Sequence, residues 1–447
     1  MQNETTRNTV FIQREIRGFM HVNDVLDDSR VDTLVNVRGW VYRSRESGRL
    51  IFLVIRDSTN IVQVVVEKGT VTPEEFEMAK KSNIETSIEV EGKVSKEQKA
   101  VTGYEIHATK VKVYQFAENF PITKDKSDEF LLDIRHLWLR SREMTAIMKM
   151  RETVLDSIRY FMRERGYHEV QPPMFVGGMV EGGSTLFEVP YFGEKAYLTQ
   201  SSQFYLEAFM YSLESVYTIS PSFRAEKSRT RRHLTEYSHY EAEAAWVGNQ
   251  QMMNLEEDMI IAIAQSLLSS NKGELEIVKR DLNKIKAVEK PFYRYRYEKV
   301  IEIGRQKGLQ LDDVTDLGEK EERTITEDFD KPIFVYNFPT ELKPFYHRPD
   351  PEDPSHVMNH DVLAPEGYGE IIGGGERIWN KDELISRMRN DNLNPEDYQW
   401  YVDLRSFGSV PHSGFGLGVD RLLTWLAGLD HINKVVPFPR TIRRLKP

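Results

Sequence analysis

The sequence predicts an α+β protein with a mainly antiparallel sheet, preceded by a small all-β domain. Beyond residue 165, short strand-like runs outnumber helical segments and alternate with them irregularly, unlike the regular order of a doubly wound fold. Residues 18–115 consist mostly of short β-branched runs separated by Gly, Asp, Asn and Ser. Neither a Walker-type phosphate loop nor a Rossmann glycine fingerprint occurs, which argues against the nucleotide-binding folds that carry them.

Composition excludes several kinds of site. The 447 residues are 40% hydrophobic and 29% charged, as in folded proteins of two or three domains. The absence of cysteine excludes disulfides, zinc–thiolate sites and thiol nucleophiles. A net charge of −10 argues against a nonspecific nucleic-acid coat, although a local basic patch can still bind nucleic acid. The N-terminal MQNETTRNTVFIQRE lacks the apolar core of a signal peptide, and no run is long enough to span a membrane. We therefore expect a cytoplasmic protein with no membrane partner.

The first domain is predicted to span residues 1–116. Its runs VDTLVNVRGWVYR, LIFLVIRDSTNIVQVVVEKG, SIEVEGKVSK and YEIHATKVKVYQ alternate as strands do, and KGTVTPEEFEMAKKS between them is helical. In that helix Thr72 can cap, Pro73 suits the first turn, and acids follow. Four or five strands with one interposed helix fit a barrel of the oligonucleotide-binding (OB) type, and a plain β-sandwich fits the same pattern.

A polar, broken linker is predicted over residues 117–133, followed by the larger domain over 134–447. That domain opens with an amphipathic helix from about Glu143 to Arg165, which Gly166 ends. Two more helices are predicted, at Gln250 to Ser270 and at Lys381 to Asn390.

Two stretches of the larger domain suggest a site. SFRAEKSRTRRHLTEY, Ser222 to Tyr237, concentrates four arginines and a lysine between apolar strands. GFGLGVDR places glycines at every second position of a strand, which leaves a flat strip of backbone that a planar ring or another strand can approach. Taken alone, the first stretch fits a solvated charged turn and the second fits a close-packed strand–helix junction.

Together these stretches resemble motifs 2 and 3 of the class II aminoacyl-tRNA synthetases. The helix through Arg159, with YHEVQPP ending at Pro173, resembles motif 1. The N-terminal barrel lies where the aspartyl/asparaginyl branch has its anticodon-binding domain, so the resemblance covers nearly the whole chain and points to the archaeal-type asparaginyl-tRNA synthetases. It implies a class II catalytic domain, ATP, L-asparagine and tRNA(Asn) as partners, and a homodimer formed through motif 1.

The resemblance also assigns the ATP site. Arg224 would clamp the α-phosphate and the substrate carboxylate, and the planar guanidinium suits both anions. Tyr237, where the family usually has Phe, would sandwich adenine with Arg421. His233 and Arg421 would meet the γ-phosphate, and Glu226 would lie near the adenine or the tRNA 3′ end. Arg224 and Arg421 are thus the expected catalytic residues, and the expected ATP-binding residues are Arg224, Glu226, His233, Tyr237, Glu370, Gly418 and Arg421.

Magnesium is the expected cofactor. Asp361 and Glu370, in DVLAPEGYGEIIGGGER, resemble the acids that hold Mg²⁺ on the β- and γ-phosphates. Aspartyl enzymes have a shorter spacing than the nine residues found here, and the longer spacing resembles the asparaginyl form. A water-rich Mg²⁺ site needs only one or two carboxylates.

The predicted amino-acid pocket distinguishes asparagine from aspartate. QSSQFYLEAF resembles an aspartyl-family segment whose lysine, the partner of the aspartate side chain, is Leu206 here. Glu241 stands at the position of an Asp in the aspartyl-family motif 2. A substrate amide could donate to Glu241 and accept from Arg377, whereas a second carboxylate would be repelled. The complete expected set is Glu181, which would receive the α-ammonium, with Ser201, Gln203, Leu206, Glu241 and Arg377.

In the barrel, Phe52 and Gln63 match family positions that stack on and read the middle anticodon base, and Arg38 would assist. Three alternatives are open at this stage. One is an aspartyl-tRNA synthetase, including one with relaxed tRNA choice, and Leu206 argues against it. Another is an asparagine synthetase-like paralogue, which would lack the barrel. The third is a non-catalytic tRNA-binding paralogue, which would have no need to keep Arg224, Glu226, Glu370 and Arg421 together.

Overall fold

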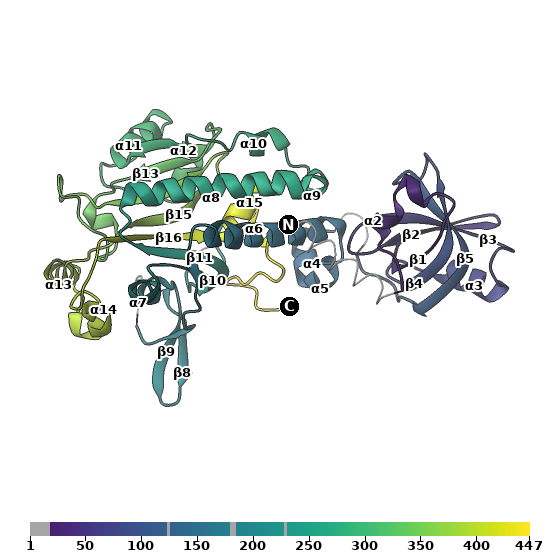
Figure 1. Cartoon of the computed structure of the whole chain (residues 1–447), viewed down its shortest axis with the longest axis horizontal. Helices are drawn as coiled ribbons and strands as arrows, with labels where there is room; N and C mark the ends of the chain where they lie inside the picture. Colours follow the sequence, from purple (N-terminus) through teal and green to yellow (C-terminus); the bar gives the residue numbers. More distant parts are fainter. Residues whose placement is uncertain (1–17, 123–125, 179–184, 228–229) are drawn as a thin grey trace. The chain divides into compact units, whose positions relative to one another are not determined.

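The computed structural model describes residues 18–122, 126–178, 185–227 and 230–447. The chain divides into two compact units, Met1–Leu131 and Leu132–Pro447 (Figure 1). The segment predicted as a linker, 117–133, carries helix α4 (Asp128–Asp133) at its end. No helix among the described ranges is both long enough and apolar enough to cross a membrane.

The first unit is a closed barrel, so the prediction of an OB-type barrel is confirmed and the sandwich alternative is wrong. Its strands follow the order β1-β2-β3-β5-β4 around the barrel, with a parallel pairing between β3 and β5. Apolar side chains at alternate strand positions, such as Ile51, Leu53 and Ile55 on β2, fill the interior. The elements are α2 (Val22–Val25), β1 (Leu34–Ser47), β2 (Leu50–Arg56), β3 (Ile61–Glu67), α3 (Pro73–Lys81), β4 (Ser87–Lys96) and β5 (Tyr104–Gln115).

Helix α3 forms where the local sequence predicts it. The Thr72 hydroxyl accepts from the Glu75 amide at 3.2 Å, and the Glu75 carboxylate accepts from the Thr72 amide at 2.8 Å. This reciprocal capping satisfies two amides that the first helical turn leaves unpaired. The helix packs Phe76 and Ala79 into the barrel core.

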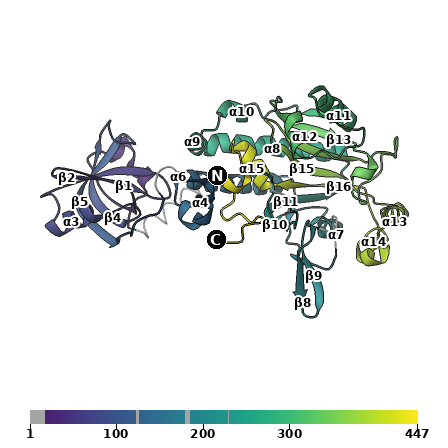
Figure 2. The same cartoon turned by 180° about the vertical axis from the view of Figure 1, so that it is seen from behind.

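The second unit is built on an eight-stranded sheet in the order β12-β13-β14-β15-β16-β11-β10-β6 (Figure 2). All pairs are antiparallel except β12–β13 and β10–β6, which confirms the predicted sheet type. Its strands are β6 (His168–Glu169), β10 (Ser215–Phe223), β11 (Glu236–Ala245), β12 (Tyr293–Arg296), β13 (Ile333–Tyr336), β14 (Asn359–Ala364), β15 (Gly369–Glu376) and β16 (His412–Gly418). A separate antiparallel sheet has the order β7-β9-β8 and comprises β7 (Phe175–Val176), β8 (Glu188–Tyr191) and β9 (Glu194–Leu198).

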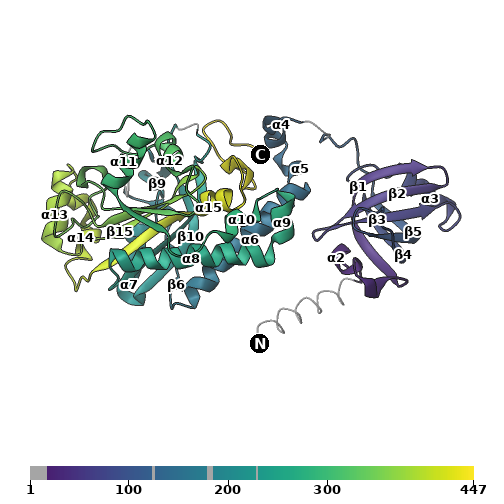
Figure 3. The same cartoon turned by 90° about the horizontal axis from the view of Figure 1, so that it is seen from above.

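Helices α6 and α8 lie side by side along one face of the large sheet (Figures 1 and 3). The predicted helix from Glu143 to Arg165 is α6, capped by Ser141 and followed by Gly166 at φ +79°. The bounds of the remaining helices are α5 (Arg135–Trp138), α6 (Arg142–Arg163), α7 (Gln203–Leu213), α8 (Asn249–Ser270), α9 (Lys272–Ile277), α10 (Leu282–Lys286), α11 (Tyr297–Gln306), α12 (Glu319–Thr326), α13 (Lys381–Asn390), α14 (Gln399–Asp403) and α15 (Val419–Leu426).

Strand alternation separates a structural face of the sheet from a functional one. On β14, His360 points to α8, where its ring nitrogens lie 2.7 Å from Asn249 Oδ1 and 2.7 Å from Glu256 Oε1. The next residue, Asp361, points to the opposite face and lines a cavity. On β14 the sheet therefore presents Asp361 to the face that α8 leaves uncovered.

Candidate active site

One cavity on this face collects most of the predicted ATP, metal and amino-acid residues. It lies over β11, β14, β15 and β16 and is closed at one side by α7 and at another by the start of α15. Glu226 is not among the lining residues. The predicted residues that line it are Ser201, Gln203, Leu206, Arg224, His233, Tyr237, Glu241, Asp361, Glu370, Arg377, Gly418 and Arg421.

The basic stretch forms the loop between β10 and β11. Arg224 follows β10, and its guanidinium carbon lies 5.8 Å from the centre of the Tyr237 ring on β11. Glu226 lies 4.0 Å from Arg224 and 3.7 Å from His233 Nε2. Burial and the charge of Arg421 lower the pKa of His233, so the imidazole is neutral near pH 7.

Arg421, in the first turn of α15, is hydrogen-bonded to Glu370 on β15. Its Nη1 donates to Glu370 Oε2 at 2.9 Å and to the Glu370 carbonyl at 3.2 Å. The neighbouring Asp420 accepts from Arg151 on α6 at 2.5 Å and from the Ser238 amide at 2.9 Å. These contacts tie the three segments that resemble motifs 1, 2 and 3 to one another.

Asp361 and Glu370 converge over β15. A Cβ placed on Gly373 would lie 3.5 Å from Asp361 Oδ1 and 3.5 Å from Glu370 Oε1, so both carboxylates face the same space. Burial raises the pKa of Asp361, whereas burial at Glu370 is outweighed by Arg421, Arg232 and Lys343, which lower its pKa to about 2. Two carboxylates on one side of a cavity fit a hard divalent cation such as Mg²⁺.

Helix α12 supplies an acid that sequence reasoning missed. Glu322 accepts from the Glu370 amide at 2.7 Å and from Arg232 Nη2 at 3.1 Å, and Arg232 itself lines the cavity. Glu322 thus anchors the backbone of a predicted metal ligand and a cation of the basic loop. It lies 48 residues before Glu370, in a helix outside every motif, so no local pattern could have identified it.

Glu241 lies at the floor of the other end of the cavity. It accepts from the Ser201 hydroxyl at 2.5 Å and from the Ser202 amide at 2.8 Å, and His239 Nδ1 lies 3.3 Å away. Burial alone would raise the pKa of Glu241, but His239 and these hydrogen bonds lower it, so the group is an anion. A buried carboxylate with its oxygens already fixed is a specific acceptor for a substrate N–H group.

Leu206 belongs both to the core and to the cavity wall. It is fully buried on α7, packs with Val170, Met210 and Val216, and lines the same cavity as Glu241. The apolar wall leaves Glu241 without a lysine from α7 as its neighbour.

Arg377 pairs with Glu243 in a fork-to-carboxylate geometry. The two nitrogen–oxygen distances are 3.1 and 3.2 Å, and the Tyr346 ring lies 5.5 Å from the guanidinium carbon. Burial raises the pKa of Glu243, against the lowering effect of Arg377. The pairing orients Arg377 for a substrate oxygen while holding its charge in a buried position.

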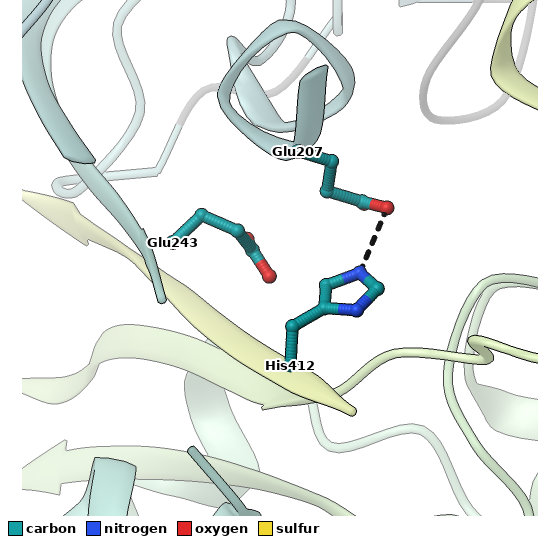
Figure 4. A group of neighbouring side chains, drawn as sticks. All are labelled: Glu207, Glu243 and His412. Carbon is teal, nitrogen blue, oxygen red and sulfur yellow. Dashed lines mark hydrogen bonds and ion pairs between the residues drawn. The ribbon is translucent and has the colours of Figure 1, made fainter. Parts of the chain in front are cut away.

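Behind Arg377, Glu207, Glu243 and His412 form a buried cluster (Figure 4). Their ligand atoms are close enough to hold a metal ion, but Glu207 already accepts from Arg405 at 2.5 Å, Tyr401 at 2.8 Å and Gln203 at 3.0 Å. His412 contacts Glu207 at 3.1 Å and the Val410 carbonyl at 2.8 Å, so its role is structural. With Arg405 and Arg377 supplying the positive charge, the cluster is an ion network that supports the cavity floor.

The alternating glycines of β16 leave space for side chains of the neighbouring strand β11. A Cβ on Gly414 would lie 1.9 Å from Glu243 Oε2, and one on Gly416 would lie 2.5 Å from His239 Nε2. The strip is therefore covered by a carboxylate and an imidazole of β11. Only glycine permits this approach, which places Glu243 and His239 close to the sheet surface.

In the barrel, Phe52 and Gln63 share a face. Gln63 pairs with Val54, and Phe52 is two positions along β2, so both side chains point outward from the barrel core. Gln63 donates to Glu105 at 2.7 Å, Arg45 lies 5.0 Å from the Phe52 ring, and Arg38 pairs with Glu89 at 3.1 Å.

Sequence reasoning also missed several cavity residues, and one predicted residue cannot be placed. Glu181 lies outside the described residues. The missed lining residues include His239, Glu243, Lys343, Tyr346 and His347. His239 and Glu243 could have been found from the two-residue period of β11. They lie two positions before and two positions after Glu241, so all three side chains point to the same face of the strand.

Comparisons with known proteins agree with this architecture. Residues 127–442 match the family described as tRNA synthetases class II (D, K and N), and residues 35–114 match an OB-fold nucleic acid binding domain. The fold and the cavity thus define a class II synthetase.

Individual relatives narrow the family. An asparagine–tRNA ligase of Thermoplasma acidophilum is 53% identical over 96% of this chain and 100% of its own length. The crystal structure of asparaginyl-tRNA synthetase from Pyrococcus horikoshii complexed with asparaginyl-adenylate has a TM-score of 0.93 at 48% identity, covering 96% of this chain and 99% of that one. Asparaginyl-tRNA synthetase from Entamoeba histolytica, also in complex with asparaginyl-adenylate, has a TM-score of 0.85 at 34% identity, covering 93% and 97%. The chain belongs to the asparagine–tRNA ligase family.

Proposed function

We propose that this chain activates L-asparagine with ATP to asparaginyl-adenylate and transfers the asparaginyl group to the 3′ end of tRNA(Asn). The main structural support for this proposal is the cavity, which combines a cationic end around Arg224 and Arg421 with an anionic, hydrogen-bonded floor at Glu241. Relatives at 49% and 53% identity are asparagine–tRNA ligases, which supports asparagine over the aspartyl and ammonia-using alternatives.

The first step needs charge stabilisation more than proton transfer. The asparagine carboxylate attacks the α-phosphorus of ATP and pyrophosphate leaves, so negative charge accumulates on phosphate oxygens. Arg224 would hold the α-phosphate and the attacking carboxylate through its planar fork, and Arg421 would face adenine and the γ-phosphate. Tyr237 would stack on the adenine, with His233 near the γ-phosphate and Glu226 beside the nucleotide.

Asp361 and Glu370 would hold the Mg²⁺ that accompanies ATP. Bound there, the ion would offset charge on the β- and γ-phosphates. Glu322 would keep the Glu370 backbone in position through its hydrogen bond to the amide.

Selection of asparagine over aspartate would depend on the part of the pocket that contacts the side chain of the substrate. The asparagine amide would donate to Glu241 and accept from Arg377, while Leu206, Ser201 and Gln203 shape the wall and Glu181 receives the α-ammonium. Aspartate would bring a carboxylate against Glu241 without the lysine that aspartyl enzymes supply, so repulsion excludes it.

The barrel would bind the anticodon through Phe52, Gln63 and Arg38. We expect Gln63→Ala to lower the efficiency of tRNA(Asn) charging by about tenfold to hundredfold, the usual cost of one lost base contact, without changing asparagine-dependent ATP–pyrophosphate exchange. Both activities are measured on the same preparation. Gln115→Ala, an exposed glutamine at the end of β5, serves as control and should change neither. An equal loss of both activities in Gln63→Ala would contradict an anticodon role.

We also propose a cytoplasmic homodimer that pairs through α6 and the segment after it. The half-exposed Tyr160 on α6 and Phe175 on β7 support this proposal. Sedimentation equilibrium should give twice the mass of one chain.

Charging assays with labelled amino acids test the function. Asparagine should become attached to a tRNA(Asn) transcript in the presence of ATP and Mg²⁺, and aspartate should not. Attachment of aspartate would favour the aspartyl enzyme, and free asparagine formed from aspartate, ATP and ammonia would favour the synthetase-like paralogue.

A further inference from the structure

Lys343 already occupies the space beside one of the two converging acids. It follows a short 3₁₀ turn, Thr340–Leu342, and its Nζ lies 2.7 Å from Asp361 Oδ2. The same ammonium lies 3.9 Å from the centre of the Phe338 ring. Its side chain is 17% exposed and that of Asp361 is 15% exposed, so the ion pair is largely removed from water.

The backbone that carries Lys343 is anchored. Arg387 on α13 donates to the Thr340 carbonyl at 2.6 Å and to the Lys343 carbonyl at 3.1 Å. The flexible part is therefore the four-carbon stem, whose ammonium can change partners while the loop stays in place.

The two acids form direct ion pairs with different cations. Glu370 is paired with Arg421 at 2.9 Å, and the guanidinium is fixed by its second bond to the Glu370 carbonyl. Asp361 is paired with Lys343. A divalent ion bound by both acids would contact Asp361 through Oδ1, which faces the same space as Glu370, while Lys343 holds Oδ2. Two cations at one buried carboxylate repel each other, so Lys343 opposes binding of the ion for as long as its ammonium stays there.

We propose that Lys343 is the resident cation of Asp361 and gates the metal site: it blocks divalent-ion binding until a nucleotide arrives, and then moves its ammonium to the phosphates. This inference rests on the proposed function, since it takes Asp361 and Glu370 as the metal-binding pair. ATP brings both the metal and an anionic destination for Lys343, so metal and nucleotide would bind cooperatively. Without nucleotide the site would hold metal weakly.

Direct binding of Mn²⁺, without ATP, amino acid or tRNA, tests the gate. Lys343→Met keeps the length of the side chain and removes its charge, so we expect the dissociation constant for Mn²⁺ to fall by about tenfold or more, as followed by the electron paramagnetic resonance signal of free Mn²⁺. Lys343→Arg keeps the charge and should bind Mn²⁺ as weakly as the unmodified chain. Lys307→Met is the matched control, because Lys307 Nζ also lies 2.7 Å from a carboxylate, Asp328, which is not among the cavity residues.

A double variant locates the effect. Adding Asp361→Asn to Lys343→Met should abolish the gain in Mn²⁺ affinity. Equal affinity in Lys343→Met and the unmodified chain would overturn the proposal, as would a gain that persists in the double variant.

Mn²⁺ binding tests the role of Lys343 independently of the proposed function. Mn²⁺ binding involves no asparagine, whereas failure of the unmodified chain to activate asparagine would reject the function alone. A gain in Mn²⁺ affinity in a chain that does not activate asparagine would still support Lys343 as the gate.

Discussion

Replacement of Arg224 by alanine should reduce asparagine-dependent ATP–pyrophosphate exchange by about 10²- to 10³-fold, the usual cost of removing a fixed donor from a site of developing negative charge. The effect should fall mainly on the rate at saturating substrates, because the α-phosphate gains charge as the carboxylate attacks. Exchange is measured without tRNA, so the acceptor end plays no part in the result.

Two matched variants make the Arg224 result specific. Arg224→Lys keeps the charge but loses the planar fork and should recover only part of the activity. Arg231→Ala removes an exposed arginine of the same loop that does not line the cavity, and should leave exchange unchanged. A comparable loss in Arg231→Ala would mean that the loop acts through its total charge and that Arg224 has no special role.

Leu206→Lys should weaken asparagine activation by about tenfold or more and admit aspartate. The new ammonium would enter the cavity wall beside Glu241 and neutralise it, which removes the repulsion that excludes a carboxylate and competes for the acceptor of the amide. The measurement is the ratio of exchange rates with asparagine and with aspartate.

The control for this pocket is Leu206→Met, which keeps an apolar side chain of similar volume in the cluster with Val170, Met210 and Val216. It should keep the preference for asparagine. If Leu206→Lys folds, as judged by its thermal unfolding, and shows an unchanged ratio, then Leu206 is only a core residue and our account of selectivity is wrong.

Local signals in the sequence, such as a capping residue or a proline in the first turn, predicted the positions of individual helices well. The Thr72 cap and Pro73 predicted α3, and the predicted range Lys381 to Asn390 is that of α13. By contrast, the segment YHEVQPPMF forms only the two-residue strands β6 and β7, because its two prolines cannot donate to a ladder.

Most of the predicted site residues line one cavity, but the contacts between them could not be predicted from the sequence. Arg224 and Arg421 lie nearly two hundred residues apart in the sequence. Only the resemblance to the synthetase motifs predicted that they belong to one site. The pairing of Arg377 with Glu243, which are 134 residues apart, depends on the order of β15, β16 and β11. No local pattern encodes that order.

The same reason explains why Lys343, which lines the cavity, and Glu322, which supports it, were missed. Lys343 stands in an irregular segment after a 3₁₀ turn, and Glu322 stands in α12 outside the motifs, so neither has a periodic or motif signal. Their role in the site depends on contacts with Glu370 and Asp361, which come together only when β14 pairs with β15.

Amino-acid-dependent ATP–pyrophosphate exchange without tRNA, asparagine against aspartate, tests most directly whether this cavity activates asparagine. We predict exchange with asparagine and none above background with aspartate. Exchange with aspartate alone would contradict the roles given to Leu206 and Glu241 and would make this member of the family an aspartate-activating enzyme.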